Sequence, residues 1–418
     1  MSSPTDSTYY RKGFGLKAEV QGELASDYDG RLVDLLKANE YTLTVDAVTV
    51  RLAREFGFCY GVERAVEYAY QTRRKFPERR LFLVGEIIHN PHVNSRLREM
   101  GVSILAPRPT AELRPGEPGF DFSGIQAEDV VILPAFGVTM EDFAALRAAG
   151  CILVDTTCGS VLNVWKRVES YARDGFTALI HGKHYHEETR ATASQVQKFE
   201  GHFLVVRDME EARLVCDYVE GRGEREAFLA KFAHAASPGF DPDLHLRKIG
   251  VANQTTMLAS ESLAIAAEVG RAMARARGEA EREASFRSFD TICSATQDRQ
   301  DAVKELLEER LDAMVVIGGY NSSNTMSLAA LCSEHVPTYH VESAHAIDPE
   351  SGTITFRPAG KHHREETAAG WLPPAGPVRV GLTAGASTPN NKIGEAVVRI
   401  FATRGIDVAR EQGLGTGD

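Results

Sequence analysis

The chain has no long apolar run: nothing in it approaches the roughly 18 residues that suggest a membrane span. Its first residues, MSSPTDSTYYRKGFG, lack the apolar stretch of a secretory signal, and acidic residues follow soon after, unlike in transit peptides. Positive charge is not in excess either, because 58 Asp and Glu outnumber 47 Lys and Arg. We therefore expect a cytoplasmic protein without a membrane or nucleic-acid partner.

Cysteine is scarce, with six residues in a chain of 418, so a disulfide framework is not expected. No two cysteines have the short spacing of common zinc sites, and the close spacing of ferredoxin clusters is also missing. Cys151, Cys216 and Cys332 stand in apolar surroundings in the sequence and are expected to be core thiols.

Apolar strand-like runs alternate with amphipathic, helix-like segments along most of the chain. The runs are RLFLVGEII, DVVILPAFG, FTALIHG, HFLVVRD, DAMVVIGGY and VRVGLTAGAS. This alternation predicts parallel α/β lobes. Residues 220–249 lack a clear period and are interpreted as an insertion, whereas GRAMARARGEAEREA, residues 270–284, is interpreted as one solvated helix.

Three cysteines, Cys59, Cys158 and Cys293, each follow a strand-like run and precede a helix-like segment. CILVDTTC and FRSFDTIC share an Asp-Thr-x-Cys ending, as though one unit had been reused. Three thiolates brought together would suit an iron-sulfur cluster; such clusters normally take four, so one iron would stay open to substrate. Two other interpretations stay open: cysteines that pack as small apolar residues, and a zinc site completed by a histidine.

Polar side chains gather where the predicted strands end, which is where open α/β sheets bind ligands. YNSSNT and GASTPNN each follow a strand and open a helix, whose N-terminal amides favour an anion. Further strand ends add histidines, a carboxyl group and hydroxyls that can bind an anion or move a proton. The residues are His89, His186, Glu188, Thr255, Ser322, Ser323, Asn324 and Ser387. Each one alone is typical of a helix cap or an ordinary polar position, but together they predict a phosphate pocket.

Eight segments, in sequence order, resemble the LytB family of 4-hydroxy-3-methylbut-2-enyl diphosphate reductases. They are FGFCYGVERAV, EIIHNPHVN, VDTTC, HGKHYHEET, QTTM, DTICSATQDRQ, YNSSNT and TAGASTP. The resemblance runs from about residue 50 to about residue 400. LPAFG and IHGKHYHEETRATAS resemble the plant and cyanobacterial branch in particular.

The resemblance implies three pseudo-threefold-related α/β lobes, with mainly parallel sheets, around a central cavity that holds a [4Fe-4S] cluster. Each lobe would supply one cysteine. The expected division is an N-terminal extension over 1–50, a first lobe over 51–150 with Cys59, a second over 151–285 with Cys158 and the insertion 220–249, a third over 286–386 with Cys293, and a C-terminal helix and tail over 387–418.

The reaction that the resemblance implies is the last step of the methylerythritol phosphate route, a reductive dehydroxylation that yields isopentenyl and dimethylallyl diphosphates. Cys59, Cys158 and Cys293 would bind the cluster, and reduced ferredoxin or flavodoxin would supply electrons. Glu188 would deliver the proton that lets the oxygen leave as water, with Thr255 and His186 orienting that network. Substrate contacts would come from His89, His186, Thr255, Ser322, Ser323, Asn324 and Ser387.

Two residues depart from the family pattern. Phe136 stands where the common bacterial branch has a histidine, so a hydrogen bond from that position to phosphate is lost. Gly159 follows Cys158 where proline is usual, which loosens the backbone after a cluster ligand. The alternative enzyme is a hydro-lyase that uses the cluster as a Lewis acid and consumes no electrons. A third reading is an iron-sulfur sensor, against which the acidic balance and the lack of a DNA-binding motif argue.

Overall fold

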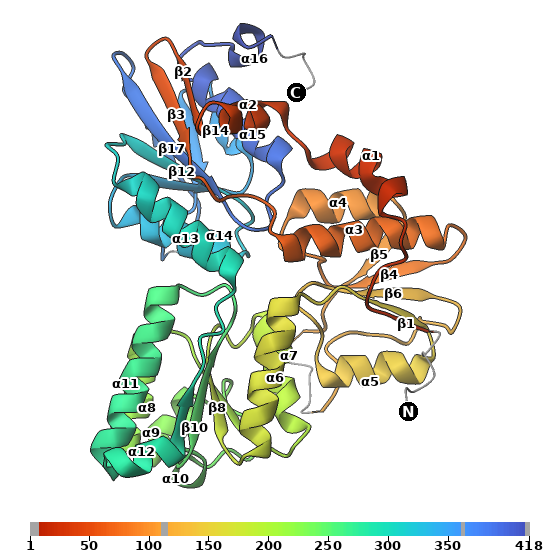
Figure 1. Ribbon diagram of the computed structural model, residues 1–418, viewed down its shortest axis with the longest axis vertical. Helices are drawn as coiled ribbons and strands as arrows, with labels where there is room; N and C mark the ends of the chain where they lie inside the picture. The colour runs from red at the N-terminus through yellow and green to blue at the C-terminus, as the bar shows by residue number, and fades with distance from the viewer. Residues whose placement is uncertain (1–7, 110–115, 361–363, 414–418) are drawn as a thin grey trace. The chain divides into compact units, whose positions relative to one another are not determined.

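The computed structural model describes residues 8–109, 116–360 and 364–413, and the chain divides into two compact units. Unit 1 consists of Met1–Gly13, Lys75–Ile87 and Leu97–Cys293, and unit 2 of Phe14–Arg74, Ile88–Arg96 and Ser294–Asp418. Both units contain mainly parallel sheets with helices (Figure 1), which confirms the predicted α/β class. No helix in the described part of the chain is both long and apolar enough to cross a bilayer.

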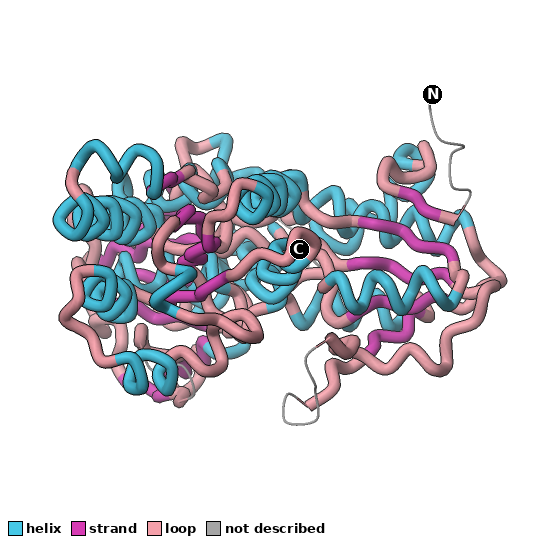
Figure 2. Tube along the Cα trace, turned by 90° about the horizontal axis from the view of Figure 1, so that it is seen from below, coloured by secondary structure: helices cyan, strands magenta, loops and turns pink. Residues whose placement is uncertain are grey.

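Unit 1 contains two fully parallel sheets. In spatial order, the first is β1 (Tyr9–Tyr10), β7 (Ile152–Asp155), β6 (Val130–Leu133), β4 (Leu81–Val84) and β5 (Val102–Leu105). The second is β11 (Phe286–Ser288), β10 (Ile249–Asn253), β8 (Thr177–His181) and β9 (Phe203–Val206). Every residue of β8 and β10 is buried, as expected for parallel strands covered on both faces. Figure 2 shows helices on either side of the strands.

Unit 2 contains one five-stranded sheet and a small antiparallel one. The larger sheet is β13 (Thr338–Val341), β12 (Ala313–Ile317), β17 (Val378–Ala384), β3 (Val48–Leu52) and β2 (Thr42–Val45), of which only β2 pairs antiparallel. The small sheet is β14 (Ile347–Asp348), β15 (Thr353–Phe356) and β16 (Glu366–Ala369). The buried strand β12 connects to the helix that opens with the predicted Ser-Ser-Asn sequence.

Helices connect most of these strands. In unit 1 they are α5 (Met140–Ala149), α6 (Gly159–Arg173), α7 (Glu187–Gln197), α8 (Met209–Val219), α9 (Arg225–Lys231), α10 (Pro242–His245), α11 (Ala259–Arg277) and α12 (Glu279–Ser285). Unit 2 contains α1 (Lys17–Tyr28), α2 (Arg31–Ala38), α3 (Tyr60–Lys75, of which Lys75 belongs to unit 1), α13 (Ser294–Leu307), α14 (Ser323–Ser333), a 3-10 turn (Ala344–Ala346), α15 (Asn390–Ala402) and α16 (Val408–Glu411). The helix α4 (Pro91–Glu99) begins in unit 2 and ends in unit 1.

The three large sheets repeat one local arrangement around the predicted ligand cysteines. Cys158 N–H donates to Ala135 O at 3.0 Å, Cys293 N–H to Thr255 O at 3.2 Å, and Cys59 N–H to Ala386 O at 3.2 Å. Each cysteine follows one strand (β7, β11 or β3), and each acceptor is the second residue after the adjacent strand (β6, β10 or β17). The sequence hint of a reused unit is therefore confirmed at the level of backbone hydrogen bonds.

The strand pairing differs from the expected lobe boundaries. β7 and β11 lie at the start of the second and third expected lobes, but β7 pairs with β6 and β11 with β10. β3 crosses the expected boundary at residue 50 and pairs with β17. The N-terminal extension is divided too, because β1 pairs with β7 in unit 1 whereas α1 and α2 belong to unit 2. The cause is that strand partners are chosen by long-range packing, which a local apolar pattern does not encode.

Two local expectations also change. The segment expected to be one helix is interrupted at Gly278, whose φ of +86° ends α11 before α12 begins. The insertion is ordered: it contains α9 and α10, and Phe228, Phe232 and Phe240 pack in the same apolar cluster as β8 and β10. The insertion therefore completes the core of the second sheet.

Candidate active site

Glu188 is buried in the first turn of α7 in unit 1. Only 2% of its surface is exposed. Glu188 Oε1 accepts a hydrogen bond from the Thr255 backbone N–H at 2.6 Å, and Oε2 accepts one from the Thr255 hydroxyl at 3.0 Å. Because β8 and β10 are adjacent, the loops that follow them meet at the carboxyl edge of the sheet. The structure thus brings Glu188 and Thr255 together and fixes both carboxyl oxygens.

His186 is the N-cap of the same helix, five positions after His181, the last residue of β8. Its Nδ1 accepts the Glu188 backbone N–H at 3.2 Å. A backbone amide can only donate, so Nδ1 is the acceptor in this bond and Nε2 is the ring nitrogen left to carry a proton. The Phe136 ring meets the imidazole edge-on, with centroids 5.7 Å apart at 81°. Phe136 therefore packs against His186, which is itself a proposed phosphate-binding residue.

Gln254 ties the loops after β8 and β10 together. Its Oε1 accepts the Lys183 backbone N–H and the Thr189 hydroxyl, both at 3.1 Å, and its Nε2 donates to Thr256 Oγ1 at 3.0 Å. Burial lowers the pKa of Lys183 to about 8. The sequence analysis gave Gln254 no role, although it is the first residue of the QTTM segment.

The two predicted ligand cysteines of unit 1 stand at the start of helices. Cys158 directly precedes α6 and Cys293 directly precedes α13, and both side chains are half-buried. Gly159 is the first residue of α6, and a Cβ there would meet no atom within 4 Å. The helix therefore starts normally without the proline usual in the family.

The other three cysteines lie in the core, as expected. Burial raises the pKa of the Cys151 thiol to about 11 and the pKa values of Cys216 and Cys332 to about 12. A thiol with so high a pKa is a poor source of thiolate near neutral pH. These three buried thiols are therefore poor candidates for metal ligands near neutral pH.

In unit 2 the predicted Ser-Ser-Asn sequence opens α14. Ser322 is the N-cap, five positions after the end of β12, and its Oγ accepts Thr325 N–H at 3.3 Å. Asn324 Oδ1 accepts Ala386 N–H at 2.9 Å, and Ala386 O in turn accepts Cys59 N–H. One hydrogen-bonded chain therefore joins the α14 N-terminus to the Cys59 loop within this unit.

Ser387 and His89 also meet in unit 2. The Ser387 hydroxyl donates to the His89 carbonyl at 3.2 Å, and both residues are buried. The prediction that GASTPNN follows a strand and opens a helix is confirmed: β17 ends at Ala384 and α15 begins at Asn390, three positions after Ser387. Gly319 is required nearby, since a Cβ there would come within 2.5 Å of the His89 carbonyl oxygen.

A buried histidine lies in the strands next to the starts of α7 and α14. His181 ends β8, which precedes α7, and His340 belongs to β13, which pairs with β12 before α14. His181 Nδ1 bonds with Ser262 Oγ at 2.8 Å, and His340 Nε2 with Gly318 O at 3.0 Å. Burial lowers the pKa of both imidazoles to about 4, so both are neutral near pH 7. These rings act as fixed polar supports of the loops.

Arg299 supports the Cys59 loop and was missed by sequence reasoning. It is 3% exposed, its Nη2 donates to Gly57 O at 2.7 Å, and its Nη1 donates to Ala295 O at 2.8 Å. The available signal was its position inside the segment DTICSATQDRQ. A buried arginine needs several hydrogen-bond acceptors, which the loop carbonyls provide here.

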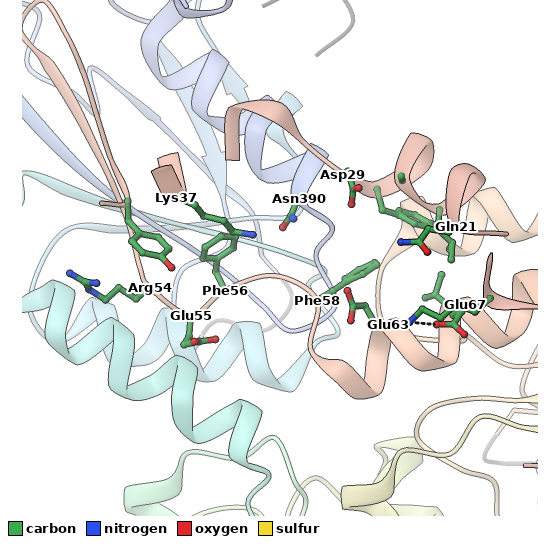
Figure 3. A pocket seen from close by; sticks show the side chains of 16 residues that line it. Gln21, Asp29, Lys37, Arg54, Glu55, Phe56, Phe58, Glu63, Glu67 and Asn390 are labelled. Atoms are coloured by element: carbon green, nitrogen blue, oxygen red, sulfur yellow. Dashed lines mark ion pairs between the residues drawn. The ribbon is translucent and has the colours of Figure 1, made fainter. Parts of the chain in front are cut away.

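A cavity of about 450 Å³ in unit 2 lies beside the Cys59 loop but contains none of the predicted site residues. Figure 3 shows Phe56 and Phe58 from that loop, with Lys37 and Asn390 close to them. The Lys37 ammonium lies 5.4 Å from the centroid of the Phe56 ring. An ion pair of 3.2 Å between Lys17 and Glu67 lies at the other end. Because the lining mixes aromatic rings with charges of both signs, it does not indicate a particular class of ligand.

The structure brings the predicted residues together in two groups. Unit 1 holds Cys158, Cys293, His186, Glu188 and Thr255, and unit 2 holds Cys59, His89, Ser322, Ser323, Asn324 and Ser387. In unit 1 the hydrogen bonds described above link Cys293, Thr255, Glu188 and His186. In unit 2 they link Cys59 to Asn324 through Ala386, and Ser387 to His89. Convergence of both groups on one ligand stays a prediction.

Comparison with known proteins gives one consistent family. The family model described as "LytB protein" matches residues 50–401. A protein of Thermosynechococcus vestitus named 4-hydroxy-3-methylbut-2-enyl diphosphate reductase is 47% identical over 404 residues, 96% of each chain. One of the same name from Gloeobacter violaceus is 48% identical, over 95% of this chain and 93% of its own.

A solved structure shares the fold at low sequence identity. It is the E-1-hydroxy-2-methyl-but-2-enyl-4-diphosphate reductase of Plasmodium falciparum, with a TM-score of 0.59 and 19% identity. The alignment covers 84% of this chain and 87% of that one. This likeness supports the architecture alone.

Proposed function

The chain belongs to the LytB family, and on that premise we propose that it reduces 4-hydroxy-3-methylbut-2-enyl diphosphate to isopentenyl and dimethylallyl diphosphates, the last step of the methylerythritol phosphate route. The reaction breaks the C–OH bond and consumes two electrons and two protons. One proton leaves with the hydroxyl oxygen as water, and the other ends on carbon. The observation that carries the proposal is the match to named reductases over nearly the full length of the chain.

Glu188 is the proposed proton donor to the leaving hydroxyl. Both of its carboxyl oxygens are held by Thr255, so the group is oriented before substrate arrives. When the carboxyl is protonated, its O–H can donate to the Thr255 hydroxyl, which can pass its own proton onward. This arrangement supports Thr255 as the relay and orienting residue.

The proposed diphosphate ligands are of two kinds. His186 offers Nε2–H as a donor because its Nδ1 is engaged by Glu188 N–H. Ser322, Ser323 and Asn324 stand at the N-terminus of α14, where helix amides favour an anion. The remaining proposed contacts are His89, Thr255 and Ser387.

The half-buried cysteines suit an iron-sulfur cluster. Cys59, Cys158 and Cys293 are each anchored through the backbone N–H and are half-buried, whereas the other three cysteines are buried. We propose that these three hold a [4Fe-4S] cluster, for which cysteine thiolate is the usual ligand. When bound, the cluster would supply electrons and one iron open to the substrate oxygen. Reduced ferredoxin or flavodoxin as donor, and a cytoplasmic location, stay predictions.

An anaerobic turnover experiment tests the proposed function. The reconstituted protein is analysed for iron and sulfide and then given the hydroxylated allylic diphosphate with dithionite and a viologen mediator. Formation of both isoprenoid diphosphates with consumption of two electrons per product is expected. Consumption of the alcohol without reductant, to a product at the same oxidation level, would instead indicate the hydro-lyase alternative, and bound zinc without iron would contradict the cluster.

A further inference from the structure

Arg299, on α13 of unit 2 (Figure 1), is a buried cation without a carboxylate partner among the residues that the structure describes. Its hydrogen bonds go to carbonyl groups alone. Nη2 donates to Gly57 O at 2.7 Å and to Phe56 O at 3.4 Å, and Nη1 donates to Ala295 O at 2.8 Å. Its Nε has no acceptor in that part of the chain. Arginine stays protonated in proteins, so a full positive charge is buried here.

Other arginines of this unit have the usual arrangement. Arg51, on β3, pairs with Glu309, and Arg54 lies 3.3 Å from Glu305 on α13. Each of these four side chains is 28% exposed or more. Two carboxylates of this region therefore pair with more exposed arginines, and the buried Arg299 is left without one.

Carbonyl acceptors orient the guanidinium group but do not neutralise it. A buried charge without a counter-charge is strongly unfavourable. Support of a loop does not by itself require a charge, because His340 bonds with the Gly318 carbonyl at 3.0 Å while burial lowers the pKa of its ring to about 4 and keeps it neutral. A purely structural role therefore leaves the charge of Arg299 unexplained.

Both main acceptors are close in sequence to proposed metal ligands. Gly57 precedes Cys59 by two positions, and Ala295 follows Cys293 by two positions. Since Gly57 O accepts from the guanidinium group, standard bond lengths place Arg299 Nη2 at most about 13 Å from Cys59 Sγ. The charge is therefore held near a thiol that is proposed to bind metal.

The loop that Arg299 contacts has a defined shape. Gly57 adopts a φ of +67°, and a Cβ at this position would come within 3.2 Å of Thr388 O. Two residues further on, Cys59 N–H donates to Ala386 O. The position of the charge relative to Cys59 is therefore fixed by the backbone on both sides.

We propose that Arg299 is the counter-charge of the [4Fe-4S] cluster assigned to Cys59, Cys158 and Cys293, and that it raises the reduction potential of this cluster. This inference rests on the proposed function. With three thiolate ligands the oxidised cluster is a net anion, and an added electron makes it more negative. A fixed positive charge nearby stabilises the reduced form more than the oxidised form. Arg299 acts through its charge and is not a metal ligand.

Anaerobic redox titration of the reconstituted protein tests this role. Electron paramagnetic resonance of the reduced cluster gives its midpoint potential in the absence of substrate, and iron and sulfide analysis gives the amount of cluster. Arg299→Gln removes the charge but keeps an amide donor, whereas Arg299→Lys keeps the charge. The comparison of these two variants therefore separates charge from hydrogen bonding.

We expect Arg299→Gln to be reduced about tenfold less readily than the parent protein, which is the effect of one charge at about 13 Å with an effective dielectric constant of about 20. For a one-electron couple this is a potential about 59 mV lower. Arg299→Lys should stay close to the parent. The matched control is Lys304→Gln on the same helix, which removes an exposed charge that lies 3.0 Å from Asp301. Its potential should also stay close to the parent, because solvent screens exposed charges.

Equal potentials for Arg299→Gln and Arg299→Lys would overturn the proposal, as would a higher potential after loss of the charge. Arg299→Met is a second uncharged variant of similar length, and it should lower the potential as Arg299→Gln does. Circular dichroism checks that each variant is folded. A bound cluster with an unchanged potential in Arg299→Gln would overturn only the role of Arg299. Absence of iron and sulfide from the parent protein would contradict the cluster, and this role with it.

Discussion

The helix starts of α7 in unit 1 and α14 in unit 2 occupy equivalent places but carry different chemistry. Each follows an interior strand of a parallel sheet, and each has its N-cap five positions after that strand ends. At α7 the residues are His186 and Glu188, which can exchange protons. At α14 they are Ser322, Ser323 and Asn324, which offer hydrogen bonds but do not titrate near neutral pH.

The difference shows how one local arrangement can serve two purposes. Helix amides and strand ends create a polar site in both units, and the side chains decide whether it moves protons or binds an anion. Changes at Glu188 should therefore lower kcat, whereas changes in the α14 group, or in the support of His186 as a proposed diphosphate ligand, should raise KM. The predictions below follow that division, from the largest effect to the smallest.

Removal of a proposed metal ligand should have the largest effect. Cys158→Ala should reduce bound iron and bring turnover to background, because three cysteines are proposed to hold the cluster. The matched control is Cys151→Ala, a buried thiol seven positions earlier, which should keep its iron and activity. Iron analysis and anaerobic turnover measure both variants; equal iron content in the two would remove Cys158 from the ligand set.

The buried histidines should make stability fall in mild acid in both units. His181 and His340 have a pKa of about 4 when folded, against about 6.5 when unfolded. The unfolded state therefore binds more protons between these values, so stability is complete above pH 6.5 and falls as the pH approaches 4. The loss is about 3 kcal/mol for each ring.

Denaturant unfolding at pH 7 and pH 5 measures this dependence. Carboxylates titrate in the same range, so the comparison is between the protein and single His181→Gln or His340→Gln variants. Each variant should lose part of the pH dependence while keeping the rest. If the free energy of unfolding changed equally between pH 7 and pH 5 in the protein and in the variants, the rings would not be held neutral in the folded state.

Loss of the α14 cap should affect binding more than chemistry. Ser322→Ala removes the acceptor of Thr325 N–H and should cost about 1 kcal/mol of stability. If Ser322 also contacts the diphosphate, KM rises while kcat changes little. Ser333→Ala at the exposed end of the same helix is the control. If Ser322→Ala lowered kcat without raising KM, the α14 group would not have the binding role assigned to it.

The edge contact of Phe136 should give the smallest effect. Phe136→Leu keeps an apolar side chain but removes the aromatic contact with His186, which is worth about 1 kcal/mol. We expect KM to rise about fivefold with kcat nearly unchanged, because His186 is held less firmly. A nitrogen-15 spectrum of the histidine side chains checks whether the ring still carries its proton on Nε2. An unchanged KM would mean that Phe136 is only a packing residue.

Local features of the fold could be predicted from the sequence, whereas pairings between distant segments could not. β12 is apolar throughout and β8 is apolar between Thr177 and His181, so their burial between helices could be predicted from residue type. The Asp-Thr-x-Cys repeat gave two of the three cysteine turns. The pairing of β3 with β17 joins segments about 330 residues apart, and nothing in the local pattern specifies it.

The candidate site shows the same limit. Glu188 and Thr255 were singled out by type and place, but their two hydrogen bonds depend on β8 and β10 being adjacent. Arg299 was missed because its role depends on carbonyl groups of a loop far away in sequence. The resemblance to a family supplied roles for the residues, and the structure supplied the contacts that support them.

The most direct test of this account is a side-by-side measurement of kcat for Glu188→Gln and Glu187→Gln in the anaerobic assay. Both variants remove one carboxylate and preserve shape, but Glu188 is buried against Thr255 whereas the Glu187 side chain is 49% exposed. We predict that kcat falls by about 100-fold or more for Glu188→Gln, with KM and iron content unchanged, and stays within about twofold for Glu187→Gln. Full turnover by Glu188→Gln would contradict its assignment as the proton donor.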